Sequence, residues 1–593
     1  MASLLQRHGW LRHALVFLAY FALAILFTWP LAPRLTTHLA GAQSDNQLFT
    51  WTFWILRQQL LDGLDPFFTN AIYYPDGISL AFHNMVLTKS LPALLLQPVM
   101  SVDAAYNLLL IFSLALNGYA MWLLVRYLTA DSIAALISGI IFGFSPILLA
   151  HAAAGHINWT GVEGLPLFAY FLLKALDQGR WQDALYAGLA AAYTVWTDWS
   201  LGLYAILFAG LLFVYRLVSE RRAHLYWPVF RQYLLVGAVA LFATLPVLLP
   251  TLSVSASGDY DMTRYIGGAA LYVSDLFGFF TPSPNHFLLG DLVQPIFGRF
   301  TAGTAEGTVF VGFSVLFLAA LGVWKIAWKK TGFWIIALIL FAVISLGPGL
   351  HLLGAYRFPW LAWLPMGSIA QDLGVPMRPE WVQMFDEAPM IPLPGALFQL
   401  LPVFKWTRVY SRYFVLGMMA VAVLSGYGLA WLRANRRVQQ AWGGTGAVWL
   451  SVFVAGIILF EFCILPFPTT VIPVPASLTE VTSEPGDYAL LDLPIRPFQL
   501  EPQYWQTHHG RPILYAHISR VPEERFAYLD FVEREVYNST GFFEQEEIRY
   551  LVLHKEKLVE MPSEEAQKLL VALDSQYRLA AEDATLRIYH AYD

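Results

Sequence analysis

Long apolar stretches recur along the first 465 residues of the chain and then cease. A stretch of about 20 apolar residues matches the roughly 30 Å hydrocarbon thickness of a bilayer. We therefore expect about eleven membrane-spanning helices in this part of the chain. They are predicted at residues 11–30, 104–126, 132–150, 160–176, 182–196, 200–217, 232–252, 308–325, 332–347, 412–432 and 445–465. This pattern predicts an α-helical polytopic membrane protein.

The pattern changes after a proline-rich linker at 466–475. Shorter apolar segments follow, which are typical of strands and one amphipathic helix. Strands are predicted at 488–493, 512–515, 549–554, 578–581 and 585–592, and a helix at 563–573. We therefore predict two domains, a transmembrane domain at 1–467 and a small extracytoplasmic α/β domain at 468–593.

Composition agrees with this division. Hydrophobic residues make up 57% of the chain and charged residues only 13%, whereas about 25% of residues are charged in an ordinary soluble protein. From Val471 onward there are 21 acidic and 11 basic residues, which makes the tail acidic. We expect no nucleic-acid partner. The single cysteine, Cys463, excludes an intrachain disulfide.

Lysine and arginine collect in alternate connections, and cytoplasmic loops are enriched in them. The basic connections contain Arg126, Lys174 and Arg180, Arg216 to Arg222, Lys325 to Lys330, and Arg433 to Arg437. With a cytoplasmic N-terminus and an odd number of spans, the C-terminal domain lies outside. The expected location is the plasma membrane, with many passes.

Every long loop is predicted on the outer side, at 31–102, 253–307 and 348–411. Loops of this length are usually functional. The first contains an amphipathic helical pattern from Asn46 to Leu61, and the third an apolar run from Ala396 to Phe404. Both are expected to lie along the membrane surface and to roof an outward-facing cavity.

Asp45 is the leading catalytic candidate, because an ionisable residue near a span end is costly and usually functional. It directly precedes the predicted helix at 46–61. An aspartate there also suits a helix cap, since its oxygen accepts hydrogen bonds from free backbone N–H groups. Both interpretations stay open.

Polar residues also follow two other predicted spans. His151, His156 and Asn158 come after the third span, and Asp198 lies in a turn between two spans. The two histidines are five residues apart, a spacing that does not place both on one helical face and argues against a metal pair. His156 and Asn158 are either substrate contacts or structural residues, and Asp198 is either part of the site or a cap.

Glu306 precedes the eighth span, while Arg408 and Arg412 precede or open the tenth. Arginines at span ends can extend toward lipid headgroups. Four apart on a helix, these two would point the same way and could bind a phosphate. We therefore treat Arg408 and Arg412 as candidate phosphate contacts and Glu306 as a candidate substrate contact.

Several familiar catalytic motifs do not occur. There is no G-x-x-x-x-G-K-[ST] loop, H-E-x-x-H pair, G-x-S-x-G elbow or C-x-x-C pair. ATP-driven pumping and hydrolysis by a familiar triad therefore lose support.

The order of the remaining motifs resembles the GT-C superfamily of polytopic glycosyltransferases, and more closely prokaryotic membrane proteins of the YfhO-like group. The matching fragments are Ser44-Asp45-Asn46-Gln47, Tyr74-Pro75-Asp76-Gly77, Phe144-Ser145-Pro146 with Gly155-His156, Tyr272 to Leu276 with Pro282-Ser283-Pro284, and Arg408 to Tyr413. The resemblance covers most of the membrane part, although each fragment is short.

This resemblance implies transfer of a sugar from a polyprenyl-phosphate or polyprenyl-diphosphate lipid to an extracytoplasmic glycan, lipid or protein acceptor. Asp45 takes the role of the acidic first-loop residue, which serves as general base or, in some members, as metal ligand. Many members have an acidic pair there, whereas Asn46 follows Asp45 in this chain. A second carboxylate must then come from Asp198 or Glu306, and the cofactor, including any divalent cation, stays unassigned.

Two other classes of function are open. A transporter or lipid flippase would use the same outer cavity, although no paired broken spans occur in corresponding halves. A non-catalytic scaffold would use the acidic C-terminal domain to bind a partner.

Overall fold

The computed structural model describes residues 9–220, 226–260, 271–361, 368, 390–398, 407–441, 445–495, 499–538 and 541–592. Backbone contacts divide the chain into two compact units. The membrane unit contains residues 1–33, 108–244 and 263–468. The mixed unit contains residues 34–107, 245–262 and 469–593, so it combines the first long loop with the C-terminal segment.

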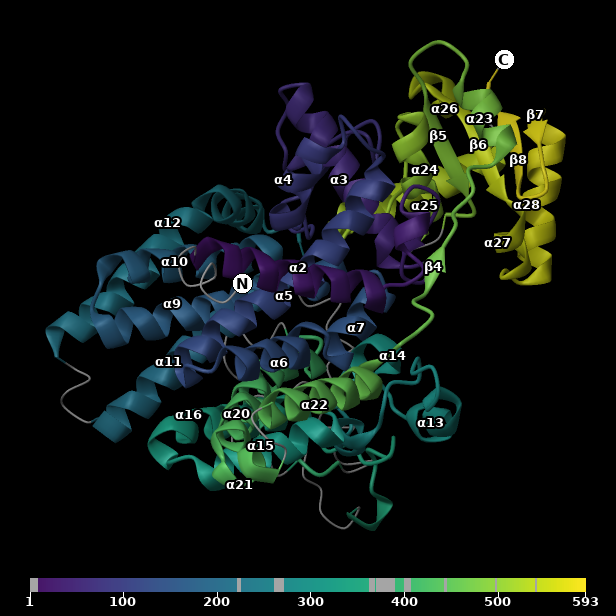
Figure 1. Cartoon of the computed structure of the whole chain (residues 1–593). Helices are drawn as coiled ribbons and strands as arrows, with labels where there is room; N and C mark the ends of the chain where they lie inside the picture. Colours follow the sequence, from purple (N-terminus) through teal and green to yellow (C-terminus); the bar gives the residue numbers. More distant parts are fainter. Residues whose placement is uncertain are drawn as a thin grey trace. The chain divides into compact units, whose positions relative to one another are not determined.

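The membrane unit is built from helices (Figure 1). They are α2 (Gly9–Phe27), most of α5 (Val102–Thr129), α6 (Ser132–Gly143), α7 (Pro146–Ala153), α8 (Ile157–Thr160), α9 (Gly164–Gln178), α10 (Trp181–Thr197), α11 (Trp199–Glu220), most of α12 (Trp227–Ser257), α13 (Gly290–Phe297), α14 (Gly303–Gly307), α15 (Phe313–Lys325), α16 (Trp328–Ser345), α19 (Gly395–Phe398), α20 (Phe414–Ala434), α21 (Arg436–Ala441) and α22 (Gly446–Phe462). Short 3-10 turns η4 (Leu276–Phe280) and η7 (Ser411–Tyr413) belong to it as well.

Each of the eleven predicted spans coincides with helix, which confirms a polytopic helical membrane protein. Among the described residues, six helices are long and apolar enough to cross a bilayer, and a seventh span results if the bent pair α6 and α7 counts as one. The difference from eleven lies in four shorter helices, α9, α10, α15 and α22, of 13 to 17 residues.

Helix α20 forms the core of the membrane unit. Every residue from Phe414 to Leu429 is buried, and the helix packs against α6, α15, α16 and α22. Small residues permit the closest of these approaches, as is usual between membrane helices. A Cβ atom on Gly428 would lie 2.0 Å from the carbonyl oxygen of Leu318, and one on Gly322 would lie 2.2 Å from that of Leu424. The α15–α20 contact therefore requires glycine at both positions.

The mixed unit contains two groups of elements that are far apart in the sequence. The first loop supplies β1 (Leu39–Ala40), α3 (Asp45–Leu61), β2 (Phe68–Thr69), β3 (Ile78–Ser79) and α4 (Leu87–Leu96). The C-terminal segment supplies β4 (Thr469–Thr470), α23 (Ala476–Thr482), β5 (Ala489–Leu493), α24 (Glu501–His509), α25 (Glu523–Asn538), α26 (Phe542–Gln545), β6 (Ile548–His554), α27 (Lys555–Val559), α28 (Ser563–Gln576), β7 (Arg578–Glu582) and β8 (Leu586–His590).

The C-terminal strands form one sheet in the order β5-β6-β8-β7, with β5 and β6 parallel and the other pairs antiparallel. Its residues form an apolar core that includes Leu491, Leu551 and Tyr589. Four of the five predicted strands are confirmed as β5 to β8, and the predicted helix at 563–573 as α28. The fifth, 512–515, pairs with β5 only through a parallel bridge between Leu490 and Ile513.

The first loop extends this sheet. Ile72 pairs in parallel with Ile513, and the Ile513 N–H donates to the carbonyl oxygen of Ala71 at 2.9 Å. Strand β1 pairs with β4 in an antiparallel ladder. The first loop and the C-terminal segment therefore share backbone hydrogen bonds within the mixed unit.

The predicted helix at 46–61 is confirmed as α3, but it is not an amphipathic surface helix. The polar residues Gln47 and Gln59, which a surface helix would expose to water, are buried together with Trp51, because α4 and α24 pack against the helix. Most of the predicted interfacial helix at 396–404 lies outside the described residues.

We predict that Gly428→Ala lowers the stability of the membrane unit by about 2 kcal/mol, because the added methyl group overpacks the α15–α20 contact. Gly456→Ala in α22 is the control, since nothing lies within 4 Å of its Cβ position. Thermal unfolding in detergent, followed by tryptophan fluorescence, measures both. Equal midpoints for the two variants would contradict the proposed close contact.

Candidate active site

His151 and His156 come together where α7 ends. Gly155 has a φ of 76°, a left-handed conformation that glycine adopts without strain. It turns the chain back, so that the His156 backbone N–H donates to the carbonyl oxygen of His151 at 2.9 Å. The two Nδ1 atoms then lie 2.9 Å apart in a hydrogen bond.

The spacing argument against a metal pair did not anticipate that the two histidines contact each other. It assumed one continuous helix, in which residues five apart diverge. Helix α7 ends at Ala153 and α8 begins at Ile157, and the turn at Gly155 between them breaks the helix.

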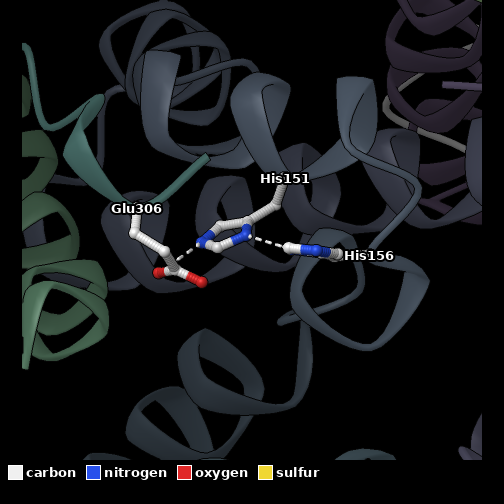
Figure 2. A group of neighbouring side chains, drawn as sticks. All are labelled: His151, His156 and Glu306. Carbon is white, nitrogen blue, oxygen red and sulfur yellow. Dashed lines mark hydrogen bonds and ion pairs between the residues drawn. The ribbon is translucent and has the colours of Figure 1, made fainter. Parts of the chain in front are cut away.

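Glu306 joins the two histidines from α14 (Figure 2). Its Oε2 atom lies 3.8 Å from Nε2 of His151. His151 is 1% exposed, and its Nε2 has no hydrogen-bond partner in the part of the chain that the structure describes. Figure 2 shows the His151 ring between the other two side chains, with one ring nitrogen toward each.

Arg412 binds the other side of Glu306. Its Nε donates to Oε1 at 2.9 Å and to Oε2 at 3.1 Å, and Nη2 donates to Oε1 as well. Ser411 donates to Oε2 at 3.2 Å. Burial alone would raise the pKa of Glu306, but the charge and hydrogen bonds of Arg412 outweigh it and hold that pKa well below its usual range. Glu306 is therefore a buried counter-ion and not a proton acceptor at neutral pH.

The Trp159 ring lies against Arg412 and His151, the two residues on either side of Glu306. The Arg412 guanidinium carbon is 4.7 Å from the Trp159 ring centroid, a cation–π distance. The His151 ring centroid is 5.7 Å from the same ring. The indole Nε1 of Trp159 is buried and has no hydrogen-bond partner among the described residues. Trp159 was not predicted, because a tryptophan near a span end is usually an interfacial anchor.

Asn158 and Asp198 form a second contact in the same unit. The Asn158 amide donates to Oδ2 of Asp198 at 2.9 Å. The other carboxylate oxygen of Asp198 accepts from the Ser200 N–H at 2.8 Å, so Asp198 does cap α11. Capping and a side-chain contact with Asn158 occur together, and the two alternatives for Asp198 do not exclude each other.

The two arginines differ in placement. Arg412 lies in the 3-10 turn η7, whereas Arg408 lies in an irregular segment before it and is exposed. They therefore do not share a helical face as predicted. The guanidinium of Arg408 is 6.0 Å from the Tyr272 ring centroid, and it makes no ion pair with any residue that the structure describes.

Asp45 belongs to the mixed unit, where it is half-buried at the first position of α3. A carboxylate there interacts favourably with the partial positive charge of a helix N-terminus. The N-cap residue is Ser44, whose side chain makes no capping hydrogen bond. The catalytic role of Asp45 stays a prediction.

His151, His156 and Glu306 are also the one group of described residues whose ligand atoms, one from each side chain, lie within 4.8 Å of one another. Two imidazoles and a carboxylate suit zinc and related ions. Zinc, however, needs its ligand atoms about 2.0–2.2 Å from one point, and His151 turns a different nitrogen toward each neighbour. The observed arrangement fits a hydrogen-bonded chain better than three ligands around one ion.

Comparison with solved structures identifies the fold of this chain. No protein-family model and no curated relative matches the sequence. The arabinofuranosyltransferase AftD from Mycobacteria is 12% identical with a TM-score of 0.50, over 97% of this chain and 40% of AftD. An oligosaccharyltransferase from Archaeoglobus fulgidus, tethered to an acceptor peptide, is 12% identical with a TM-score of 0.50, over 98% of this chain and 74% of that chain. The chain has the GT-C fold, as its resemblance to that superfamily predicted.

We predict that Glu306→Gln destabilises the protein at neutral pH by about 3 kcal/mol, because Arg412 loses its buried counter-ion. The pKa of Glu306 is lowered from 4.5 to about 2 in the folded state. The ionised carboxylate therefore stabilises the fold fully above pH 4.5, and this contribution is lost as the pH falls toward 2.

The unfolding midpoints of wild type and variant should accordingly converge as the pH falls below 4.5, and thermal unfolding between pH 7 and pH 3 measures this. A constant difference over the whole range would contradict an ionised, paired Glu306.

Proposed function

We propose that this protein is a membrane glycosyltransferase that transfers a sugar from a polyprenyl-phosphate- or polyprenyl-diphosphate-linked donor to an extracytoplasmic acceptor. The observation that carries the proposal is the polar cluster of Glu306, Arg412 and the two histidines, in which Glu306 and His151 are buried, in a chain of GT-C fold. Ionisable residues inside a membrane unit are costly and usually mark a functional site.

The donor phosphate would be bound by Arg412 and Arg408. Glu306 holds the Arg412 guanidinium in one orientation, and a preorganised cation stabilises charge that develops on a departing phosphate. Arg408 is exposed, so it can move toward the same phosphate and contribute charge that Glu306 does not neutralise. Arginine suits this role because its planar guanidinium binds phosphate through two hydrogen bonds.

Asp45 would act as general base. The proton of the acceptor hydroxyl passes to the carboxylate, the hydroxyl oxygen forms a bond with the anomeric carbon of the sugar, and the bond to the phosphate oxygen breaks. A positioned base of this kind contributes roughly 10²- to 10⁴-fold to the rate.

His156, Asn158 and Asp198 would contact the sugar or the acceptor. Imidazole, amide and carboxylate groups offer both donors and acceptors to sugar hydroxyls. No step is assigned to a metal ion. The membrane lipids surround the donor's polyprenyl chain, and the basic loops support an outward-facing reaction with a cytoplasmic N-terminus.

We predict that Asp45→Asn abolishes transfer in proteoliposomes supplied with lipid-linked sugar, because the amide cannot accept the acceptor's proton. Asp62→Asn, at the exposed C-terminal end of the same helix α3, is the matched control and should keep full activity. Product is measured as sugar covalently attached to the acceptor, and thermal unfolding confirms that both variants are folded.

Full transfer by the Asp45→Asn variant would contradict the assignment of the base. Movement of the lipid-linked sugar across the bilayer without any new covalent product would instead favour a transporter or flippase.

A further inference from the structure

The C-terminal segment contacts the first loop both before and after Asp45 in the sequence. On one side of Asp45, β4 pairs with β1, and the Thr470 hydroxyl donates to the carbonyl oxygen of Gly41 at 2.8 Å. On the other side, α24 packs against α3. Residues that follow position 468 therefore contact both the chain just before Asp45 and the helix that begins with it.

Gln506 of α24 is the centre of this contact. It is 0% exposed, and its Oε1 accepts a hydrogen bond from Nε1 of Trp51 at 2.7 Å. Its Nε2 donates to the carbonyl oxygens of Ala71 and Arg511, at 2.6 and 3.0 Å. One side-chain amide thus joins α3, the first-loop segment at Ala71 and the C-terminal segment, and both of its N–H donors are used.

Trp51 makes this contact specific for α3. Its side chain is 0% exposed, and its indole N–H can only donate, so it requires an acceptor at the position of Gln506 Oε1. Asp45 and Trp51 belong to the same helix. A rotation or shift of α3 that breaks the Trp51–Gln506 bond would therefore move the Asp45 carboxylate as well.

Asn107 and Asn46 hold the chain just before Asp45 in the same way. The Ala40 N–H donates to Oδ1 of Asn107 at 2.8 Å, and Nδ2 of Asn46 donates to the Ala40 carbonyl oxygen at 3.1 Å. Both asparagines are 0% exposed. The segment leading into α3 is thus fixed by buried hydrogen bonds, and α24 fixes the helix that follows.

We infer that the C-terminal segment is a positioning element for Asp45, and that Gln506 and Trp51 are its positioning residues. This inference rests on the proposed role of Asp45 as base. It assigns the C-terminal segment an intramolecular partner, the first loop, in place of a separate binding protein.

The test uses the full-length protein in lipid nanodiscs with Trp51→Phe and Gln506→Leu. Both variants remove the indole–amide hydrogen bond and leave the Asp45 side chain chemically unaltered. We expect kcat to fall about 10-fold, since small misplacements of a catalytic group reduce the rate strongly, while the KM for the donor stays within about twofold because the arginines that bind phosphate are unchanged. The limb of the kcat–pH profile that reports the base should shift in both variants.

Arg525→Ala is the matched control. Arg525 joins the same two segments through an ion pair with Asp76 at 2.8 Å, but the 61% exposed Asp76 side chain is not on α3. This variant should change neither kcat nor the pH profile, because exposed ion pairs contribute little.

Hydrogen exchange of the α3 amides gives a readout that does not depend on activity. Exchange across residues 45–61 should be faster in Trp51→Phe and Gln506→Leu than in wild type and Arg525→Ala. Unchanged exchange would overturn the inference, and so would faster exchange with an unaltered kcat. If wild type transfers no sugar at all, the proposed function fails, while the exchange result still decides whether Gln506 holds α3.

Discussion

The ion pair between Glu306 and Arg412 is the interaction on which the polar part of the membrane unit depends. A carboxylate that is 7% exposed loses most of its hydration, and it stays ionised because a guanidinium and a serine hydroxyl replace the water. The pair joins α14 to the start of α20, and His151 and Trp159 pack against it. The segments that contain Glu306, Arg412 and His151 are distant in the sequence. They meet because the buried Glu306 carboxylate requires the Arg412 guanidinium beside it.

A different kind of constraint holds the mixed unit together. Two of its three sequence segments, 34–107 and 469–593, share a sheet, through the bridge between Ile72 and Ile513, and a buried amide, Gln506. Neither segment satisfies these polar groups alone, and an unsatisfied buried donor or acceptor costs about 1–3 kcal/mol. The acidic C-terminal segment is thus part of the fold of the first loop, and a role in binding a partner protein is not needed to explain it.

The sequence predicts those features that depend on local periodicity. Spans such as α20 and strands such as β6 can be predicted from the sequence, because a long apolar run indicates a membrane span and a short one indicates a buried strand. The histidine pair was missed because a single glycine, Gly155, breaks the helix within the five-residue interval. The partners of Trp51 and Glu306 lie 455 and 106 residues away, and no local pattern contains that information. Asp45, chosen from its position before a helix, still depends on a test of activity.

Arg408 and Arg412 show how burial separates two residues that the sequence treats alike. Arg412 is held by Glu306 and Trp159, so its orientation is fixed, but much of its charge is already neutralised. Arg408 is exposed and unpaired with any described residue, so its charge is available but its orientation is not fixed. A departing phosphate needs both directed hydrogen bonds and net positive charge. Arg412 is suited to directed hydrogen bonds, and Arg408 is suited to supplying net positive charge. This difference favours distinct roles for the two arginines over two equivalent phosphate contacts.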